Sequence, residues 1–295
     1  MIKNYFNLLR VPQWIKNFFV FAPLVFSKHL FDIHYVIPSL QGFIIFCLVS
    51  SIVYILNDII DIEADRAHPK KKFRPIPSGA VSKATAIILG VILFVIMIAS
   101  LYFIGNSNYT IVVLSYFILN AFYSMSFKHI VLLDIFSIAA GFMLRVISGA
   151  VIISVPISSW LILTTMFLSL YLGVMKRYSE LEIVPNGGSV TSTRKVLTHY
   201  SPVFTQQMAT IAAAGVIICY ALYTVTPRTV TEFGTDNLIY TTPFVVFGIF
   251  RYMYLTYINQ KGENTTEIML TDAAMISNVF LYIIITTLII YKIII

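Results

Sequence analysis

Acidic side chains gather in one stretch of the chain, NDIIDIEADRAHPKKKFRPIPSG, which covers residues 57–79. It holds three Asp, one Glu and one Asn in a chain of which only 11% is charged. On a helix, Asn57, Asp61 and Asp65 share one face because they are four residues apart, and Asp58 lies beside them. Hard oxygen ligands that converge in this way suit Mg²⁺ shared with a phosphorylated substrate. We therefore predict Asn57, Asp61 and Asp65 as metal ligands and Asp58, Asp61 and Asp65 as catalytic residues.

A basic run follows these acidic residues directly. Its Lys and Arg side chains come within reach of phosphate oxygens, which cationic groups bind through charge-assisted hydrogen bonds. Arg66, Lys71 and Arg74 are the predicted phosphate ligands of this run. The alternative is a solvated loop whose basic residues only mark the cytoplasmic side of a membrane. The chemical interpretation is preferred, because carboxylates seldom collect at a membrane boundary without a function.

The composition indicates an integral membrane protein with several spans. The chain has 295 residues, 58% of them hydrophobic, and a mean hydropathy of +0.86. A soluble domain would be about a quarter charged. The net charge of +7 is therefore attributed to short connections that meet lipid or phosphates, and not to nucleic-acid binding. Both cysteines lie in apolar runs, which argues against a disulfide framework or a cysteine metal site.

Nine apolar runs are long enough to be membrane spans. They cover roughly 14–30, 36–56, 83–104, 109–125, 132–153, 157–175, 203–226, 238–258 and 273–293. With the N-terminus in the cytoplasm, sixteen Lys and Arg residues fall inside, three outside, and Arg145 within a span. This bias follows the positive-inside rule and places the acidic stretch at the cytoplasmic face. We expect one all-α transmembrane domain over residues 1–295, and the sequence leaves homo-oligomer formation open.

A second polar corner, YSMSFKHIVLLD, runs from Tyr123 to Asp134, with Lys128 at the predicted membrane boundary. Arg145 follows Asp134 by eleven residues, so both lie on one helix face. Charged residues on an apolar helix are costly against lipid, and this face is expected to line the bundle interior or a wet cavity. The alternatives are an interhelical ion pair for Arg145 and a boundary anchor for Lys128.

A third polar corner, MKRYSELE, covers residues 175–182. Lys176 and Glu180 are four residues apart and can pair on one helix face. Arg177 and Tyr178 project elsewhere and could hold a phosphate or a sugar hydroxyl. A solvated helix end explains the same residues, so this segment alone is unspecific.

Together, these motifs resemble the UbiA-type intramembrane prenyltransferase superfamily. The resemblance rests on NDxxDxxxD at the end of a second span and on a following polar corner with Tyr, Lys and Asp. It is closer to the decaprenyl-phosphate phosphoribosyltransferase branch, because the second corner has one Asp and an FKH string instead of the acidic motif of aromatic prenyltransferases. The segments that resemble this branch are LRVPQWIKN (9–17), the stretch at 57–79, YSMSFKHIVLLD (123–134), GFMLRVISG (141–149), MKRYSELE (175–182) and TDAAMISNVFLY (271–282).

The resemblance implies nine helices around a central cavity, in the inner or plasma membrane, with the active site facing the cytoplasm. It implies transfer of 5-phosphoribosyl from phosphoribosyl pyrophosphate to a polyprenyl phosphate, with release of pyrophosphate. Mg²⁺ would neutralise the charge on that leaving group. The acceptor phosphate is already anionic and needs no general base. The substrate-binding candidates are Lys16, Arg66, Lys71, Arg74, Tyr123, Lys128, Asp134, Arg145, Lys176, Arg177, Tyr178 and Glu180.

Three other functions stay open at this point. An aromatic prenyltransferase would share the fold and the first motif. A membrane transporter with an acidic cation site would move a substrate without forming a covalent product, and would show broken helices in matching halves, which the sequence lacks. A CDP-alcohol-type phosphotransferase ranks last, because its DGxxAR pattern is absent.

Overall fold

The computed structural model describes residues 2–68, 70–182, 195–259 and 271–292, and this part of the chain is helical with no strand. With η for 3₁₀ helices, its first half contains α1 (Ile2–Leu8), η1 (Val11–Phe21), α2 (Ala22–Phe26), α3 (Ile33–Ile60), α4 (Ile62–Ala67), η2 (Lys71–Phe73), α5 (Lys83–Ile104), α6 (Ser107–Met125), η3 (Phe127–His129) and α7 (Leu133–Ile152). Its second half contains α8 (Ser159–Glu182), η5 (Lys195–His199), α9 (Pro202–Val225), α10 (Pro227–Phe233), η6 (Asn237–Thr241), α11 (Thr242–Tyr257) and α13 (Ala273–Ile290). The all-α prediction is confirmed for these residues.

Seven stretches of the described chain are long and apolar enough to cross a membrane. They are α3, α5, α7, α8, α9, η6 with α11, and α13. The run predicted at 109–125 is a helix, α6, but it carries two Asn residues and is not one of these seven. The run predicted at 14–30 is divided between η1 and α2, each of which has a Pro in its first turn. Proline removes the amide that would continue a preceding helix, so this run is not one α-helix.

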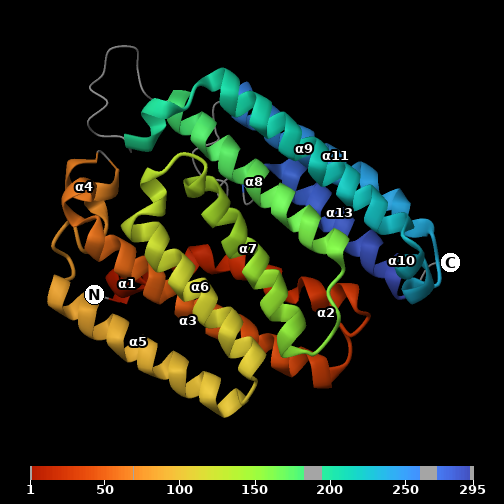
Figure 1. Cartoon of the computed structure of the whole chain (residues 1–295), viewed down its shortest axis with the longest axis horizontal. Coiled ribbons are helices and arrows are strands. Elements are labelled where there is room, and N and C mark those ends of the chain that lie inside the picture. Colours follow the sequence, from red (N-terminus) through yellow and green to blue (C-terminus); the bar gives the residue numbers. More distant parts are fainter. Residues whose placement is uncertain (1, 69, 183–194, 260–270, 293–295) are drawn as a thin grey trace.

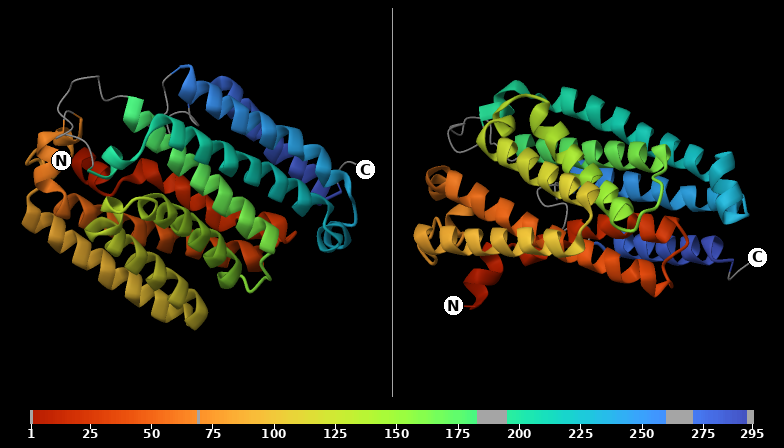
Figure 2. Two further views of the ribbon diagram at one scale, coloured as in Figure 1. Left: turned by 45° about the horizontal axis from the view of Figure 1, so that its top comes forward. Right: turned by 60° about the horizontal axis from the view of Figure 1, so that its bottom comes forward.

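Helix α7 lies at the centre of the bundle and packs against η1, α2, α3, α6 and α8. Figure 1 shows the helices of the first half beside those of the second, and the left view of Figure 2 shows the same division. Helix α4 lies at one end of the bundle, whereas α10 and the C-terminus lie at the other. The polar connections after α3 therefore lie at the opposite end from α10.

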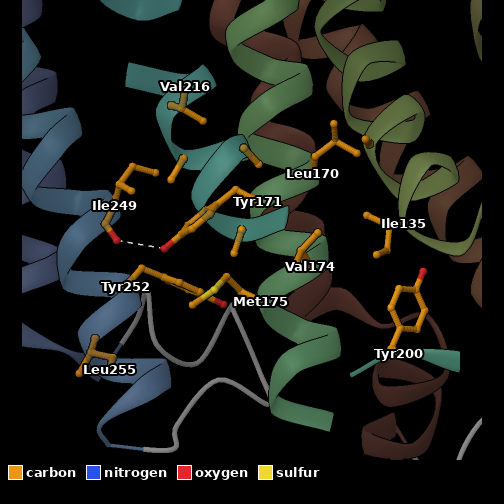
Figure 3. Close-up of a cluster of buried hydrophobic side chains, with 14 of the residues drawn as sticks. Ile135, Leu170, Tyr171, Val174, Met175, Tyr200, Val216, Ile249, Tyr252 and Leu255 are labelled. Atoms are coloured by element: carbon orange, nitrogen blue, oxygen red, sulfur yellow. Dashed lines mark hydrogen bonds between the residues drawn. The ribbon is translucent and has the colours of Figure 1, made fainter. Parts of the chain in front are cut away.

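The second half has an apolar core between α8, α9 and α11 (Figure 3). Tyr171 is fully buried there, and its hydroxyl donates a hydrogen bond of 3.0 Å to the Ile249 carbonyl. This bond joins α8 to α11 and gives the phenol a partner that it needs away from water. By contrast, α5 exposes a continuous apolar surface, which includes Ile88, Val91 and Val95. Such a surface fits lipid rather than water as its solvent.

Helix η1 lies close against α7 at Gly149. A Cβ atom on Gly149 would lie 1.9 Å from the carbonyl oxygen of Val20. We expect Gly149→Ala to push η1 away from α7 and to lower the stability by about 1–3 kcal/mol, the usual cost of overpacking. Thermal unfolding in detergent measures this. The matched control is Gly90→Ala on α5, where the new Cβ would meet only an Ile55 side chain at 3.5 Å. Equal unfolding midpoints for the two variants would contradict the expectation.

Candidate active site

The acidic stretch lies where α3 ends and α4 begins. Asn57 and Asp58 belong to the last turn of α3, Asp61 stands at the junction, and Asp65 follows in α4. The amide of Asp61 donates to the carbonyl of Asn57, and the amide of Asp65 donates to that of Asp61. These bonds keep the four-residue spacing through the junction. The acidic side chains therefore stay close to one another at this end of the bundle.

Arginines bridge two of the three carboxylates. Asp58 is fully buried, and its Oδ1 accepts hydrogen bonds from Arg10 at 2.7 Å and from Arg74 at 3.3 Å. The same nitrogen of Arg74 donates to Oδ2 of Asp65 at 2.5 Å. Arg74 thus holds the two acids against each other, and Arg10 joins the N-terminal segment to them. Sequence reasoning missed Arg10, whose only signal was its place in the LRVPQWIKN segment.

The third carboxylate joins the first polar corner to the second. Asp61 accepts a hydrogen bond from Nζ of Lys128, which is 67 residues further along the chain. The side chain of Lys128 is 5% exposed, so it is not a snorkelling boundary anchor. Three carboxylates, Asp58, Asp61 and Asp65, thus meet three cations, Arg10, Arg74 and Lys128. The cluster is formally neutral.

The donor groups of this cluster suit a hard cation. Among the described residues, no three His, Cys, Asp or Glu side chains are placed to hold a metal ion as they stand, since the carboxylates pair with cations. The Oδ2 atom of Asp58 is buried and has no hydrogen-bond partner. Asn57, too, makes no side-chain hydrogen bond within the part of the chain that the structure describes. Carboxylate and amide oxygens are the ligands that Mg²⁺ takes, so the residues fit the predicted ion.

Arg145 is buried in the bundle interior and is surrounded by neutral acceptors. It donates to Oδ1 of Asn17 at 2.8 Å, to the carbonyl of Gly141 at 3.0 Å and to the hydroxyl of Tyr116 at 2.7 Å. The guanidinium also lies over the ring of Tyr116, 4.8 Å from its centroid. Within the described residues, no carboxylate pairs with Arg145. Asn17 and Tyr116 were not predicted, because one amide and one aromatic residue in apolar runs give no signal.

Lys16 adds a second cation to this region. The positive charges of Arg145 and Arg10 both act on it, so Lys16 lies close enough to each arginine to be repelled by it. Lys16 makes no hydrogen bond or ion pair with any residue in the described ranges. Two interior cations without acidic partners are costly, and an anion between them would lower that cost.

The third polar corner forms a separate buried network. Arg177 is fully buried, and it donates from Nε to Asp134 at 2.6 Å and from Nη1 to Glu180. The hydroxyl of Tyr200 donates to the other oxygen of Asp134 at 2.8 Å. Burial raises the pKa of Tyr200, which keeps this hydroxyl protonated. Asp134 and Arg145 therefore have different partners, although they share a helix face.

The remaining candidates lie at the edge of these clusters. Arg66 is exposed and pairs with the exposed Glu63. Lys71 is half-buried in η2, and Tyr123 lies near enough to Arg177 to act on its charge. Tyr178 is buried against the ring of Tyr257, with 4.8 Å between centroids. Lys176 is half-buried on α8, one turn before Glu180.

A cavity of about 270 Å³ with both polar and apolar lining residues lies at the other end of the bundle. Its lining includes Ser27, His29, Arg228 and Glu232, none of which was predicted as a site residue. The predicted central cavity beside the acidic cluster stays a prediction.

Comparisons with known proteins identify the family and agree with the helical fold. A model of the UbiA prenyltransferase family matches residues 18–283. The decaprenyl-phosphate phosphoribosyltransferase of Mycolicibacterium smegmatis is 35% identical over 227 residues, which are 76% of this chain and 70% of the relative. The protein of that name in Mycobacterium tuberculosis H37Rv is 32% identical, over 76% of this chain and 74% of the relative. A UbiA homologue from Archaeoglobus fulgidus, solved bound to GPP and Mg²⁺, has a TM-score of 0.70 and 17% identity, and the match covers 98% of this chain and 97% of that one.

Proposed function

Because the chain belongs to the UbiA prenyltransferase family, we propose that it transfers a 5-phosphoribosyl group from phosphoribosyl pyrophosphate to a polyprenyl phosphate. Pyrophosphate is the leaving group. The name that the mycobacterial relatives carry, over three quarters of this chain, supports this reaction. The structural observation that carries the proposal is the neutral cluster of Asp58, Asp61 and Asp65 with Arg10, Arg74 and Lys128.

A magnesium–pyrophosphate group carries positive and negative charges side by side, and so does this cluster. The carboxylates and Asn57 would hold Mg²⁺, which when bound neutralises the negative charge on the leaving pyrophosphate. Arg74 and Lys128 would then exchange their carboxylate partners for phosphate oxygens of the donor, which both side chains bind well. The exchange keeps every buried charge paired, so donor binding leaves no isolated ion in the site. Mg²⁺ in the related Archaeoglobus protein supports this metal for the family fold.

The interior cations have the complementary role towards the acceptor. Lys16 and Arg145 lie among apolar helices and lack acidic partners within the described residues, and the acceptor is an anionic phosphate on an apolar chain. They would hold that phosphate facing the anomeric carbon of the donor. The phosphate oxygen is already a charged nucleophile, so the chain has no need of a base. Orientation by two fixed cations raises the rate because the reacting atoms are held in attack geometry.

We place the N-terminus and the acidic cluster on the cytoplasmic side of an inner or plasma membrane, with nine spans in total. Sixteen Lys and Arg residues on that side against three on the other support this orientation. Phosphoribosyl pyrophosphate is a soluble and highly charged donor, and it would reach the cluster from the cytoplasm. The lipid acceptor would enter laterally from the bilayer.

An aromatic prenyltransferase is the second candidate, and the Archaeoglobus structure with GPP favours it. The two functions are separated by incubating membranes that contain the protein with two labelled substrate pairs. One pair is phosphoribosyl pyrophosphate with polyprenyl phosphate, and the other is prenyl diphosphate with 4-hydroxybenzoate. We expect label in a lipid product from the first pair alone. Product from the second pair alone would reject the proposed function.

A further inference from the structure

Tyr200 lies outside every predicted motif, directly after η5, and its hydroxyl makes two hydrogen bonds at the second polar corner. It accepts from the backbone amide of Leu132 at 2.8 Å and donates to Oδ1 of Asp134 at 2.8 Å. Val196 and Leu197 of η5 are buried, and Val196 belongs to the same apolar core as Tyr200. The phenol therefore links the segment before α9 to the start of α7.

The backbone at Leu132 is strained. Its φ is 68° and its ψ is −41°, a conformation that residues with a side chain rarely adopt. A residue held in such a conformation persists only when its surroundings fix it, and the Tyr200 hydroxyl is the partner of the Leu132 amide. Leu132 is also the residue at which α7 begins, because its carbonyl accepts hydrogen bonds from the amides of Ile135 and Phe136 in the first turn.

Leu132 lies three residues after η3, the short helix that carries Lys128. Helix η3 (Phe127–His129) packs against η5, α6 and the start of α7. Lys128 is buried within this segment and reaches Asp61 of the acidic cluster. A shift in the backbone at Leu132 would therefore move Lys128 relative to Asp61.

We propose that Tyr200 is a positioning residue that fixes the second corner through Leu132 and thereby holds Lys128 against Asp61. This inference rests on the proposed function where it concerns the rate of phosphoribosyl transfer. Asp134 and Arg177 also support this corner. Tyr200 donates to Oδ1 of Asp134, and Arg177 donates to Oδ2. Their contribution to the reaction is then the placement of Lys128 rather than contact with the substrate.

The test compares Tyr200→Phe with Tyr171→Phe. Each change removes one buried hydroxyl with a backbone partner, and both residues are seen in Figure 3. We expect Tyr200→Phe to lower kcat about tenfold, because it removes both hydrogen bonds of the hydroxyl, one of them to a carboxylate, with KM for the lipid unchanged. Tyr171→Phe is expected to keep kcat and to lose a similar amount of thermal stability. Equal kcat values for the two variants would overturn the proposal.

Two further measurements separate positioning from general destabilisation. Hydrogen exchange of the peptide over 126–134 should accelerate about tenfold in Tyr200→Phe, and stay at the wild-type rate in Tyr171→Phe. Adding Leu132→Gly to Tyr200→Phe should recover part of kcat, because glycine adopts a positive φ without strain. Unchanged exchange, or no recovery, would overturn the role of Leu132. If the wild type transfers no phosphoribosyl group, the proposed function fails, and the exchange comparison still decides whether Tyr200 holds the corner.

Discussion

Replacing Asp61 with Asn is expected to lower phosphoribosyl transfer at least about a hundredfold at saturating Mg²⁺, the usual cost of removing one group that stabilises transition-state charge. Asn keeps the size of the side chain but removes the charge. The site then loses the negative charge of a metal ligand, and Lys128 loses its only ion-pair partner in the described part of the chain. Initial rates with purified protein, measured over a range of Mg²⁺ concentrations, test this expectation.

The matched control is Glu63→Gln, two residues away in the same stretch. The Glu63 side chain is 84% exposed and pairs with the exposed Arg66. The transfer rate of Glu63→Gln should therefore match that of the wild type. Thermal unfolding of both variants separates a loss of chemistry from a loss of folded protein. Near wild-type turnover of Asp61→Asn would show that Asp61 does not hold the metal.

Replacing Arg145 with Met is expected to lower kcat/KM for the polyprenyl phosphate about a hundredfold. Hydrogen bonds to a charged group contribute about 1.5–3 kcal/mol each, and the loss of one such bond to the acceptor phosphate accounts for this factor. Met fills a similar volume among apolar helices. Asn17 and Tyr116 both retain Ser50 as a hydrogen-bond neighbour, which limits the damage to the fold.

Two further variants test whether the effect is local to this interior site. Arg145→Lys keeps the charge but cannot reach three acceptors in separate directions, so its rate should fall between those of the wild type and Arg145→Met. Arg228→Gln removes an exposed cation at the opposite end of the bundle and should leave kcat/KM unchanged. If Arg145→Met bound and used the lipid as well as Arg228→Gln does, Arg145 would have a structural role alone.

The sequence predicted the helical elements well where apolar runs end sharply. The run at 83–104 coincides with α5, because Ser82 caps its start and Gly105, with a positive φ, ends it. The N-terminal run was predicted less well, because it divides into η1 and α2 where Pro23 stands in the first turn of α2. A hydropathy value averaged over a window of residues does not show where a proline interrupts a helix.

Helical periodicity predicted which face a residue occupies but not its depth along the helix. Asp134 and Arg145 share a face of α7, yet eleven residues of helix separate them by about 16 Å. Asp134 therefore meets Arg177 and Tyr200 near one end, whereas Arg145 meets Asn17 deeper in the bundle. Partners from distant parts of the chain could not be inferred from one helix pattern.

The composition of the acidic cluster could be predicted, but its pairing could not. The spacing of Asp58, Asp61 and Asp65 placed them together, since steps of three and four residues return to one face of a helix. Their partners Arg10 and Lys128 come from segments 48 and 67 residues away, and only tertiary packing brings them in. The metal-binding role of the acids was inferred from their chemistry alone, and it remains a prediction.

The most direct test of the account is mass spectrometry of the lipids that the purified protein forms from polyprenyl phosphate, phosphoribosyl pyrophosphate and Mg²⁺. We expect a single new lipid that is heavier than the acceptor by one 5-phosphoribosyl group. Pyrophosphate should form in equal amount, and both should be lost in Asp61→Asn. An unchanged lipid alongside full consumption of the donor, or a product that lacks the pentose, would contradict it.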